Sequence, residues 1–291
     1  MRDAVDGVLL LDKPSGPSSN AVLQRAKRLV GAARAGHTGT LDPLASGLLV
    51  IAFGEATKFA GGLLEADKAY RATLKLGART STGDAEGEVL ERSEVAVTED
   101  GLRGVLERFR GEIGQVPPMH AAIKHEGRPL YAYARRGESV ERSARQVTIR
   151  RLDPERFDRD EADLYVECSK GTYIRTLAED IGEALGCGAH LVALARVAVG
   201  SFTLAQAIRL EELEALPLAE RRARLMPSQS LLGGWPQLRL PAELSAKFRQ
   251  GRAVPADSAD GNVAVFGGDE AFLGTGEVAS GTLKPRRLLA S

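Results

Sequence analysis

The residues best suited to chemistry lie in one short glycine-rich stretch, residues 36–47 (GHTGTLDPLASG). Glycine adopts backbone conformations that other residues avoid, so the stretch predicts a tight loop that another group approaches closely. Asp42 is its only acid, and Pro43 favours an extended backbone before it. A carboxylate between the apolar Leu41 and Leu44 has the dry surroundings typical of catalytic acids. The competing interpretation is a helix N-cap, because Asp followed by Pro commonly starts a helix.

The elements that must hold this loop mix strands and helices without a regular alternation. Apolar runs or alternating apolar residues predict strands at 7–12, 70–76 and 164–168. Helices are predicted after the capping residues 18–20, after Thr98 and after Gly171, each with an apolar face. We therefore expect an α+β fold with a mixed, largely antiparallel central sheet.

A change in composition predicts a domain boundary. Between residues 218 and 235 charged residues give way to Pro, Ser and Gly. We expect residues 1–230 to form the larger domain, which carries the glycine-rich loop. Residues 237–291 contain short strand-like pieces at 264–266, 271–273 and around 277–278, separated by glycines, and predict a small β-rich, barrel-like module.

The charge of the chain is balanced overall but concentrated locally. Lys plus Arg and Asp plus Glu both number 39, yet residues 120–151 hold eight Lys or Arg against three Glu. Such a segment can bind a phosphate backbone, or it can be a solvated basic loop. No apolar run approaches the roughly 20 residues that cross a bilayer. We expect a cytoplasmic protein without membrane contact.

The two cysteines, Cys168 and Cys187, are too few for a secreted disulfide scaffold and are predicted to be buried thiols. Cys187 and His190 have a spacing used by metal ligands, but a matching second pair is missing, so we expect no metal site. The sequence also lacks the glycine-rich fingerprints of nucleotide and dinucleotide sites.

Five blocks of the chain together resemble one family. Residues 37–49 (HTGTLDPLASGLL) resemble the signature loop of the TruB family of tRNA pseudouridine-55 synthases. The other blocks follow in the family's order: residues 7–16 (GVLLLDKPSG), 68–70 with 80–87 (KAY and TSTGDAEG), 115–118 with 122–124 (QVPP and AIK), and 168–178 (CSKGTYIRTLA). Five ordered blocks over nearly the whole chain are far more specific than any single one.

The resemblance implies a pseudouridine-synthase fold with a C-terminal PUA-like module, and a role for each matching residue. Asp42 falls on the catalytic aspartate, and Arg175 on the arginine that pairs with it and would keep it ionised. Tyr70 falls on the tyrosine that packs against the target base. Tyr173 and Leu194 fall on positions that line the uridine pocket, and His37 on a histidine that contacts RNA beside the flipped nucleotide.

Four positions depart from the family's commoner pattern. His120 and Ala121 stand where an aromatic residue and a serine are usual, and Ala195 and Val197 replace an arginine and a threonine. These departures affect contacts with the substrate rather than the catalytic residues.

The reaction implied by the resemblance is the isomerisation of uridine 55 in the T arm of tRNA by base flipping. It requires no cofactor or metal, and the implied partner is tRNA, without a guide RNA or a protein partner. Whether Asp42 attacks C1′ or removes a proton from C2′ stays open. Residues of about 120–151 resemble the insertion with which the family clamps the RNA arm, and residues 237–291 resemble a shortened PUA module.

Three alternatives keep part of this interpretation. A non-catalytic RNA-binding protein would retain the fold without turnover. A glycosidase would use paired carboxylates, such as Asp42 with Asp84, and would release free uracil. A dyskerin-like enzyme of the same superfamily would depend on a guide RNA.

Overall fold

The computed structural model describes residues 5–119, 121, 123–134 and 136–290, so His120, Ala122 and Arg135 lie outside the described residues. The described chain divides into two compact units. Unit 1 contains the residues up to Leu41, then Leu48–Glu65, and the residues from Gly200 onward. Unit 2 contains Asp42–Gly47 and Ala66–Val199.

Unit 2 is built on a sheet whose neighbouring strands run antiparallel. In spatial order its strands are β12 (Ala189–Val199), β4 (Lys68–Leu76), β11 (Glu161–Cys168), β10 (Arg145–Asp158) and β7 (Gly111–Gln115). On the side of β12 away from β4, Ser46 pairs in parallel with Ala195. The expected mixed, largely antiparallel sheet is confirmed.

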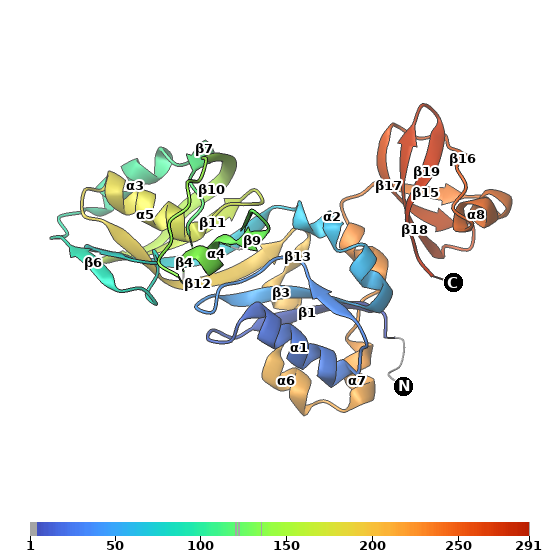
Figure 1. The fold of residues 1–291 in the computed structure, drawn as a ribbon, viewed down its shortest axis with the longest axis horizontal. Coiled ribbons are helices and arrows are strands. Elements are labelled where there is room, and N and C mark those ends of the chain that lie inside the picture. The colour runs from blue at the N-terminus through green and yellow to red at the C-terminus, as the bar shows by residue number, and fades with distance from the viewer. Residues whose placement is uncertain (1–4, 120, 122, 135, 291) are drawn as a thin grey trace. The chain divides into compact units, whose positions relative to one another are not determined.

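Two helices cover the apolar side of this sheet. They are α3 (Glu99–Glu107) and α5 (Ile174–Ala184), which lie beside β10 and β11 in Figure 1. The Thr98 hydroxyl accepts a hydrogen bond from Gly101 N–H at 3.1 Å, so the predicted cap of α3 is present. Alternate residues of β11 are buried and pack with both helices in one core. Burying each large apolar side chain contributes about 1.5–3 kcal/mol, which fixes α5 on the sheet.

The remaining elements of unit 2 are short. They are β5 (Ala78–Thr80) paired with β6 (Val89–Arg92), β8 (Lys124–His125) paired with β9 (Arg128–Pro129), and α4 (Leu130–Ala134). Strand β10 begins at Arg145, so residues 145–151 of the expected basic loop belong to the sheet. Val147 and Ile149 explain this difference, because they alternate with polar residues and are buried.

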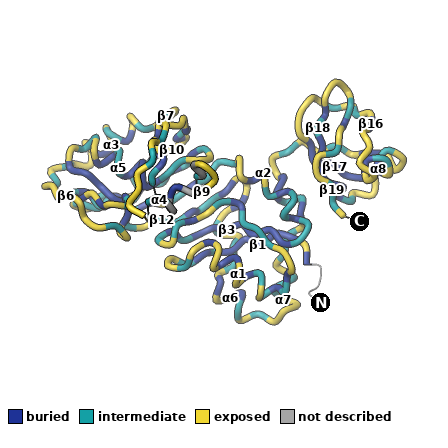
Figure 2. Tube along the Cα trace, viewed as in Figure 1, coloured by how far each residue is buried: buried dark blue, intermediate teal, exposed yellow. Residues whose placement is uncertain are grey.

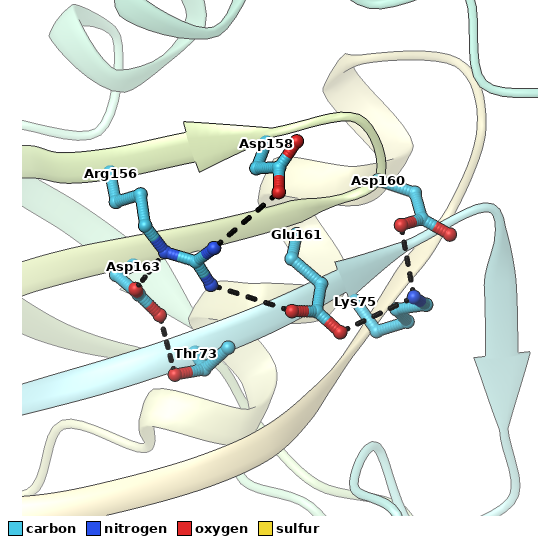
Figure 3. A network of polar contacts seen from close by, with 7 residues as sticks. All are labelled: Thr73, Lys75, Arg156, Asp158, Asp160, Glu161 and Asp163. Atoms are coloured by element: carbon cyan, nitrogen blue, oxygen red, sulfur yellow. Dashed lines mark hydrogen bonds and ion pairs between the residues drawn. The ribbon is translucent and has the colours of Figure 1, made fainter.

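A polar network joins β4 to the β10–β11 hairpin (Figure 3). Two cations hold it together. Arg156 lies 3.7, 3.4 and 2.7 Å from the carboxylates of Asp158, Glu161 and Asp163, and Lys75 lies 2.9 and 3.3 Å from those of Asp160 and Glu161. The Thr73 hydroxyl donates to Asp163 at 2.6 Å. Exposed pairs of this kind contribute about 0–1 kcal/mol each, so the network chiefly fixes strand register.

Unit 1 contains a second run of strands, in the order β14, β1, β3. The elements are β1 (Gly7–Lys13), β2 (Ala35–His37), β3 (Ser46–Phe53, from Leu48 onward in this unit) and β14 (Ile208–Arg209). Strand β1 pairs in parallel with β14, and β2 pairs antiparallel with β3. Strands β1 and β3 are buried almost throughout (Figure 2).

Helix α1 (Ser19–Val30) packs on these strands and agrees with the sequence prediction. The Ser18 hydroxyl caps its start, and Gly31 ends it with a φ of 73°. The shorter elements of unit 1 are η1 (Gly54–Lys58), α2 (Gly61–Leu64), β13 (Phe202–Thr203), η2 (Leu204–Gln206), α6 (Leu210–Ala215), α7 (Leu218–Ala223) and η3 (Ser228–Leu232).

The C-terminal residues form a separate five-stranded sheet with one helix, α8 (Ala242–Arg249). The strand order is β15 (Gln237–Leu240), β17 (Gly261–Gly267), β18 (Phe272–Ala279), β19 (Thr282–Leu288) and β16 (Val254–Pro255). Strand β18 runs without a break through Gly274, where the sequence suggested separate pieces. A Cβ at Gly274 would lie 2.0 Å from the Arg287 carbonyl oxygen, so glycine permits close pairing with β19.

Both cysteines are buried, as predicted. Burial raises the pKa of the Cys168 thiol to about 11. His190 Nδ1 lies 3.0 Å from the Ala78 carbonyl oxygen. Within the described part of the chain, His, Cys, Asp and Glu side chains form no group of three or more that would hold a metal ion. None of the helices described there is long and apolar enough to span a membrane.

Candidate active site

Asp42 lies in the loop between β2 and β3, all of which the structure describes, and no helix begins in this loop. The Ala45 N–H donates to the Asp42 carbonyl at 3.1 Å and closes a turn. Just before Asp42, the Ser19 hydroxyl bonds both backbone groups of Leu41, each at 2.8 Å. The helix-cap interpretation of Asp42 is therefore wrong, and the loop holds this carboxylate for another purpose.

Arg175 reaches Asp42 from the first turn of α5. Its Nη2 lies 3.0 Å from Asp42 Oδ2. The arginine side chain is only 6% exposed, whereas the aspartate side chain is 41% exposed. The cation is thus fixed inside the unit, and the carboxylate that it binds remains accessible from outside.

Asp84 is a second carboxylate beside the same guanidinium. Arg175 Nε lies 3.7 Å from Asp84 Oδ2, and the Asp84 side chain is 4% exposed. Its Oδ1 accepts hydrogen bonds from the Thr82 hydroxyl at 2.5 Å and from Glu86 N–H at 3.1 Å. Arg175 also donates to the Thr82 carbonyl at 3.2 Å. Asp84 and its loop therefore hold Arg175 in place from the buried side.

This arrangement gives Asp42 a defined direction and a persistent counter-charge. Arginine remains protonated in proteins and presents several N–H donors in one plane, so one guanidinium can serve two carboxylates. Charge interactions are stronger where water is excluded, as it is around Arg175. A carboxylate held in this way can attack an electrophilic carbon or remove a proton. Asp84 is too deeply buried to be the second, accessible carboxylate that a glycosidase would need.

Two tyrosines stand near Asp42. Tyr70 is half-buried on β4, and Tyr173 is the residue before α5. Burial raises the pKa of both phenols, and the negative charge of Asp42 acts on both in the same direction. The structure therefore brings both aromatic candidates into electrostatic range of the candidate carboxylate.

A buried glutamine fixes the backbone at Tyr173. The Gln115 Nε2 donates to the Tyr173 carbonyl at 3.3 Å, and its Oε1 accepts from Tyr173 N–H at 3.0 Å. Gln115 is 2% exposed, so this two-point contact is shielded from water. It joins the end of β7 to the start of α5 and thereby positions the turn that carries Arg175.

The last two expected residues lie in different units. Leu194 on β12 is half-buried against the same core as Leu44 and Tyr70, and its carbonyl accepts the Ser46 hydroxyl at 3.4 Å. His37 ends β2 in unit 1, where it is the register partner of Ile51. Unit 2 thus contains Asp42, Tyr70, Tyr173, Arg175 and Leu194, but not His37.

The sequence prediction assigned no positioning role to Asp84, Gln115 or Arg196. Arg196 is the only Lys or Arg in the otherwise mostly apolar strand β12 and is 2% exposed. Arginine is rarely buried to this extent without partners. An arginine within an apolar strand is therefore the sequence feature that could have pointed to Arg196. For Asp84 and Gln115 the sequence shows only that both lie in matching blocks. Their contacts with Arg175 and Tyr173 depend on long-range pairing.

The described arginines of the basic segment differ in their surroundings. Most of them are engaged within the protein: Arg136 with Glu138 at 2.8 Å, Arg142 with the Pro117 carbonyl at 2.9 Å, Arg150 with Asp67 at 2.5 Å, and Arg151 with Asp153 at 2.5 Å. Arg145 is exposed at the start of β10, and its charge acts on Tyr173. Among the described arginines of this segment, Arg145 is the one whose charge acts on a candidate site residue.

Models of three families match consecutive parts of the chain. The TruB family pseudouridylate synthase N-terminal domain matches residues 27–174, and the tRNA pseudouridylate synthase B C-terminal domain matches residues 175–232. The Pseudouridine synthase II TruB C-terminal family matches residues 236–289. The chain belongs to the TruB family.

Curated TruB relatives match this chain from end to end. A tRNA pseudouridine synthase B from Burkholderia mallei is 54% identical over 298 residues, which cover 100% of this chain and 99% of the relative. A tRNA pseudouridine synthase B from Thiobacillus denitrificans is 55% identical over 292 residues, which cover 100% of this chain and 98% of the relative.

Solved structures confirm the expected pseudouridine-synthase fold for this TruB protein. A chain in the archaeal box H/ACA sRNP Nop10-Cbf5 complex is 25% identical with a TM-score of 0.76, over 98% of this chain and 86% of that one. A chain of an H/ACA RNP bound to a substrate RNA is 23% identical with a TM-score of 0.75, over 98% and 85%. The C-terminal sheet with α8 fits the PUA-like module expected after residue 236.

Proposed function

We propose that this protein is an isomerase that converts uridine 55 in the T arm of tRNA to pseudouridine, acting without a guide RNA or protein partner. The observation that carries the proposal is the accessible Asp42 carboxylate held 3.0 Å from the buried Arg175. Full-length relatives named tRNA pseudouridine synthase B support tRNA as the substrate.

The reaction needs no co-reactant, because uridine and pseudouridine are isomers. It does need a carboxylate. The N1–C1′ bond breaks, the base turns, and a C5–C1′ bond forms. C5 then loses its proton, and N1 gains one. Asp42 would either attack C1′ or remove a C2′ proton, and both routes need an ionised, directed carboxylate beside the sugar. Arg175 supplies this direction and a counter-charge by holding Asp42 in place.

The target base must leave the folded RNA loop to reach Asp42, at a cost of a few kcal/mol. Tyr70 would offset this cost by stacking on the base, which contributes about 1–3 kcal/mol. Tyr173 and Leu194 would line the site around the base. His37 would contact the RNA beside the flipped nucleotide.

The rest of the tRNA would be held outside the catalytic loop. We assign this role to the basic segment of about 120–151, with Arg145 as its principal phosphate contact, and to the PUA-like module at residues 237–291. Residues 1–230 would form the catalytic domain. One of the solved relatives comes from a complex with Nop10, and the other from an H/ACA RNP. The full-length match to tRNA pseudouridine synthases B supports a stand-alone enzyme instead.

The proposal is tested by incubating the purified protein with an unmodified tRNA transcript and mapping pseudouridine at single-nucleotide resolution. We expect one site, at position 55, and none in a transcript with cytidine there. Modification at another position would contradict the assigned target. Modification only after a guide RNA is added would exclude the stand-alone enzyme, and release of free uracil would indicate a glycosidase.

A further inference from the structure

Arg196 is the largest fully buried side chain of the described chain, and its position is not explained by the Asp42–Arg175–Asp84 group. It lies on β12 and is 2% exposed. Moving a guanidinium out of water costs several kcal/mol unless its charge and its N–H groups find partners. An apolar side chain would fill this interior position at lower cost. An arginine at this position therefore indicates a specific task.

The backbone places Arg196 opposite Tyr70. Strands β12 and β4 run antiparallel, and Arg196 is the register partner of Tyr70. Directly opposed residues project on the same face, with Cβ atoms about 4.5–5.5 Å apart. The register shifts immediately after Arg196, and such irregularities redirect side chains. A side-chain hydrogen bond joins the guanidinium to the Tyr70 hydroxyl.

The same residue borders the loop that carries Asp42. A Cβ at Gly47 would lie 2.4 Å from the Arg196 carbonyl oxygen, so the end of that loop packs directly on the Arg196 backbone. Gly47 has a φ of 96°, which glycine tolerates best. Arg196 therefore contacts the loop of Asp42 with its backbone and Tyr70 with its side chain.

We propose that Arg196 is a positioning residue that fixes the Tyr70 hydroxyl as a hydrogen-bond donor into the space beside Asp42. Arginine has no acceptor atom, so in their hydrogen bond the guanidinium donates and the phenolic oxygen accepts. The hydroxyl proton must then point away from Arg196. Burial raises the pKa of Tyr70 and outweighs the opposing effect of the Arg196 charge, so the phenol keeps that proton. A donor fixed before the substrate arrives needs no reorganisation during the reaction.

The inference rests on the proposed function for its kinetic test, which is a double-mutant cycle. Four proteins are compared in single-turnover assays on unmodified tRNA: wild type, Tyr70→Phe, Arg196→Gln and the double variant. We expect each single change to slow the reaction about 10–100-fold while tRNA Kd changes less than about 3-fold. The double variant should be no slower than the slower single variant. If Arg196 served only the fold, its replacement would cost the same factor in both backgrounds.

A second measurement does not depend on activity. In protein labelled at the tyrosine 13Cζ, the Tyr70 resonance is assigned by its loss in Tyr70→Phe. We expect this resonance to move at neutral pH in Arg196→Gln, and to move less in Arg196→Lys, which retains a charged donor. Arg71→Gln is the control, because Arg71 is the exposed neighbour of Tyr70 and pairs with Glu155 at 3.0 Å. An unmoved resonance in a folded Arg196 variant would overturn the inference.

The two tests separate failure of the inference from failure of the proposed function. If the wild type forms no pseudouridine in tRNA, the proposed function fails, and the 13C resonance still decides the Arg196–Tyr70 contact. If Arg196→Gln does not fold, Arg196→Lys replaces it in both the cycle and the spectra. Additive rate losses with an unmoved resonance would then exclude the positioning role.

Discussion

Arg175 and Asp42 form an ion pair in which only the cation is buried: 6% of the arginine side chain is exposed, against 41% of the aspartate side chain. Arg175 is desolvated when the protein folds, with Asp84 and the Thr82 carbonyl as further partners. The direction of Asp42 is therefore set before any substrate binds. This is the preorganisation that makes a charged group effective in a transition state.

The first prediction concerns Asp42→Asn, which keeps the size of the side chain but removes its charge. We expect single-turnover pseudouridine formation to fall by more than about 1000-fold, because an amide can neither attack C1′ nor act as a base. Folding and tRNA affinity should stay near wild type, since 41% of the side chain is exposed. Yield and tRNA Kd are measured on one preparation. A variant that binds tRNA and reacts at a near-normal rate would remove Asp42 from the mechanism.

The second prediction concerns Arg175→Met, which retains an apolar stem of similar length. Arg175 orients Asp42 and supplies its counter-charge, and each 1.36 kcal/mol of transition-state stabilisation that is lost corresponds to a tenfold fall in rate. We expect a rate loss of about 100-fold or more with little change in tRNA Kd. The matched control is Arg103→Met, because Arg103 is 53% exposed and pairs with Glu99 on α3. Equal rates for the two variants would show that Asp42 does not depend on Arg175.

The third prediction concerns phosphate contacts in the basic segment. Arg142 is unsuitable for this test, because its guanidinium donates to the carbonyls of Pro117 and Val140 and supports the local backbone. Arg145→Glu should weaken tRNA binding and lower the slope of log K against log salt by about one. Arg103→Glu should leave the slope unchanged. A wild-type slope in Arg145→Glu would assign this arginine to the solvated surface.

The fourth prediction concerns the pH dependence of stability. Burial, reinforced by the charge of Glu183, raises the pKa of Asp180 from 3.8 to about 6. The folded state therefore holds this proton more tightly than the unfolded state. Ionised Asp180 destabilises the fold, with an effect that is absent below about pH 4, grows up to pH 6 and is complete above it.

Asp180→Asn should therefore stabilise the protein at pH 7.5 and not at pH 4. The raised pKa sets an upper limit of about 3 kcal/mol. We expect about 1 kcal/mol, because the side chain is partly exposed and solvent screens its charge. Urea unfolding at both pH values measures the difference. Asp257→Asn, an exposed loop position, is the control and should show no pH-dependent change. Equal stabilisation of Asp180→Asn at both pH values would contradict the assignment.

The features predicted correctly from the sequence are the local ones. Helices α1 and α3 begin at the expected caps, Ser18 and Thr98, because capping depends on residues within one turn. The loop composition left Asp42 open between a catalytic acid and a helix cap, and the block resemblance paired it with Arg175, which the structure places 3.0 Å away. The loop conformation expected for residues 145–151 was wrong, because arginines there conceal the buried alternation of β10.

Features that depend on distant pairing were not recognisable. Arg196 meets Tyr70 only because β12 pairs with β4, and Asp84 meets Arg175 only because its loop bridges to Leu191 on β12. In the C-terminal sheet, Gly274 resembles a break in a strand until its close approach to Arg287 is known. A single sequence contains no direct record of which distant segments pair.

The parallel pairing of β1 with β14 has a consequence for the order of folding. Leu11 lies opposite Ile208, so one of the first strands synthesised has a partner almost two hundred residues later. At about 5–20 residues per second, a nascent β1 waits on the order of ten seconds or more for β14. Strands β10 and β11 are joined by a short turn and can pair as soon as they emerge. In pulsed hydrogen exchange during refolding, amides of the β10–β11 hairpin should become protected before those of β14, the edge strand that pairs with β1. The opposite order would show that long loop closure does not limit assembly of the N-terminal strand.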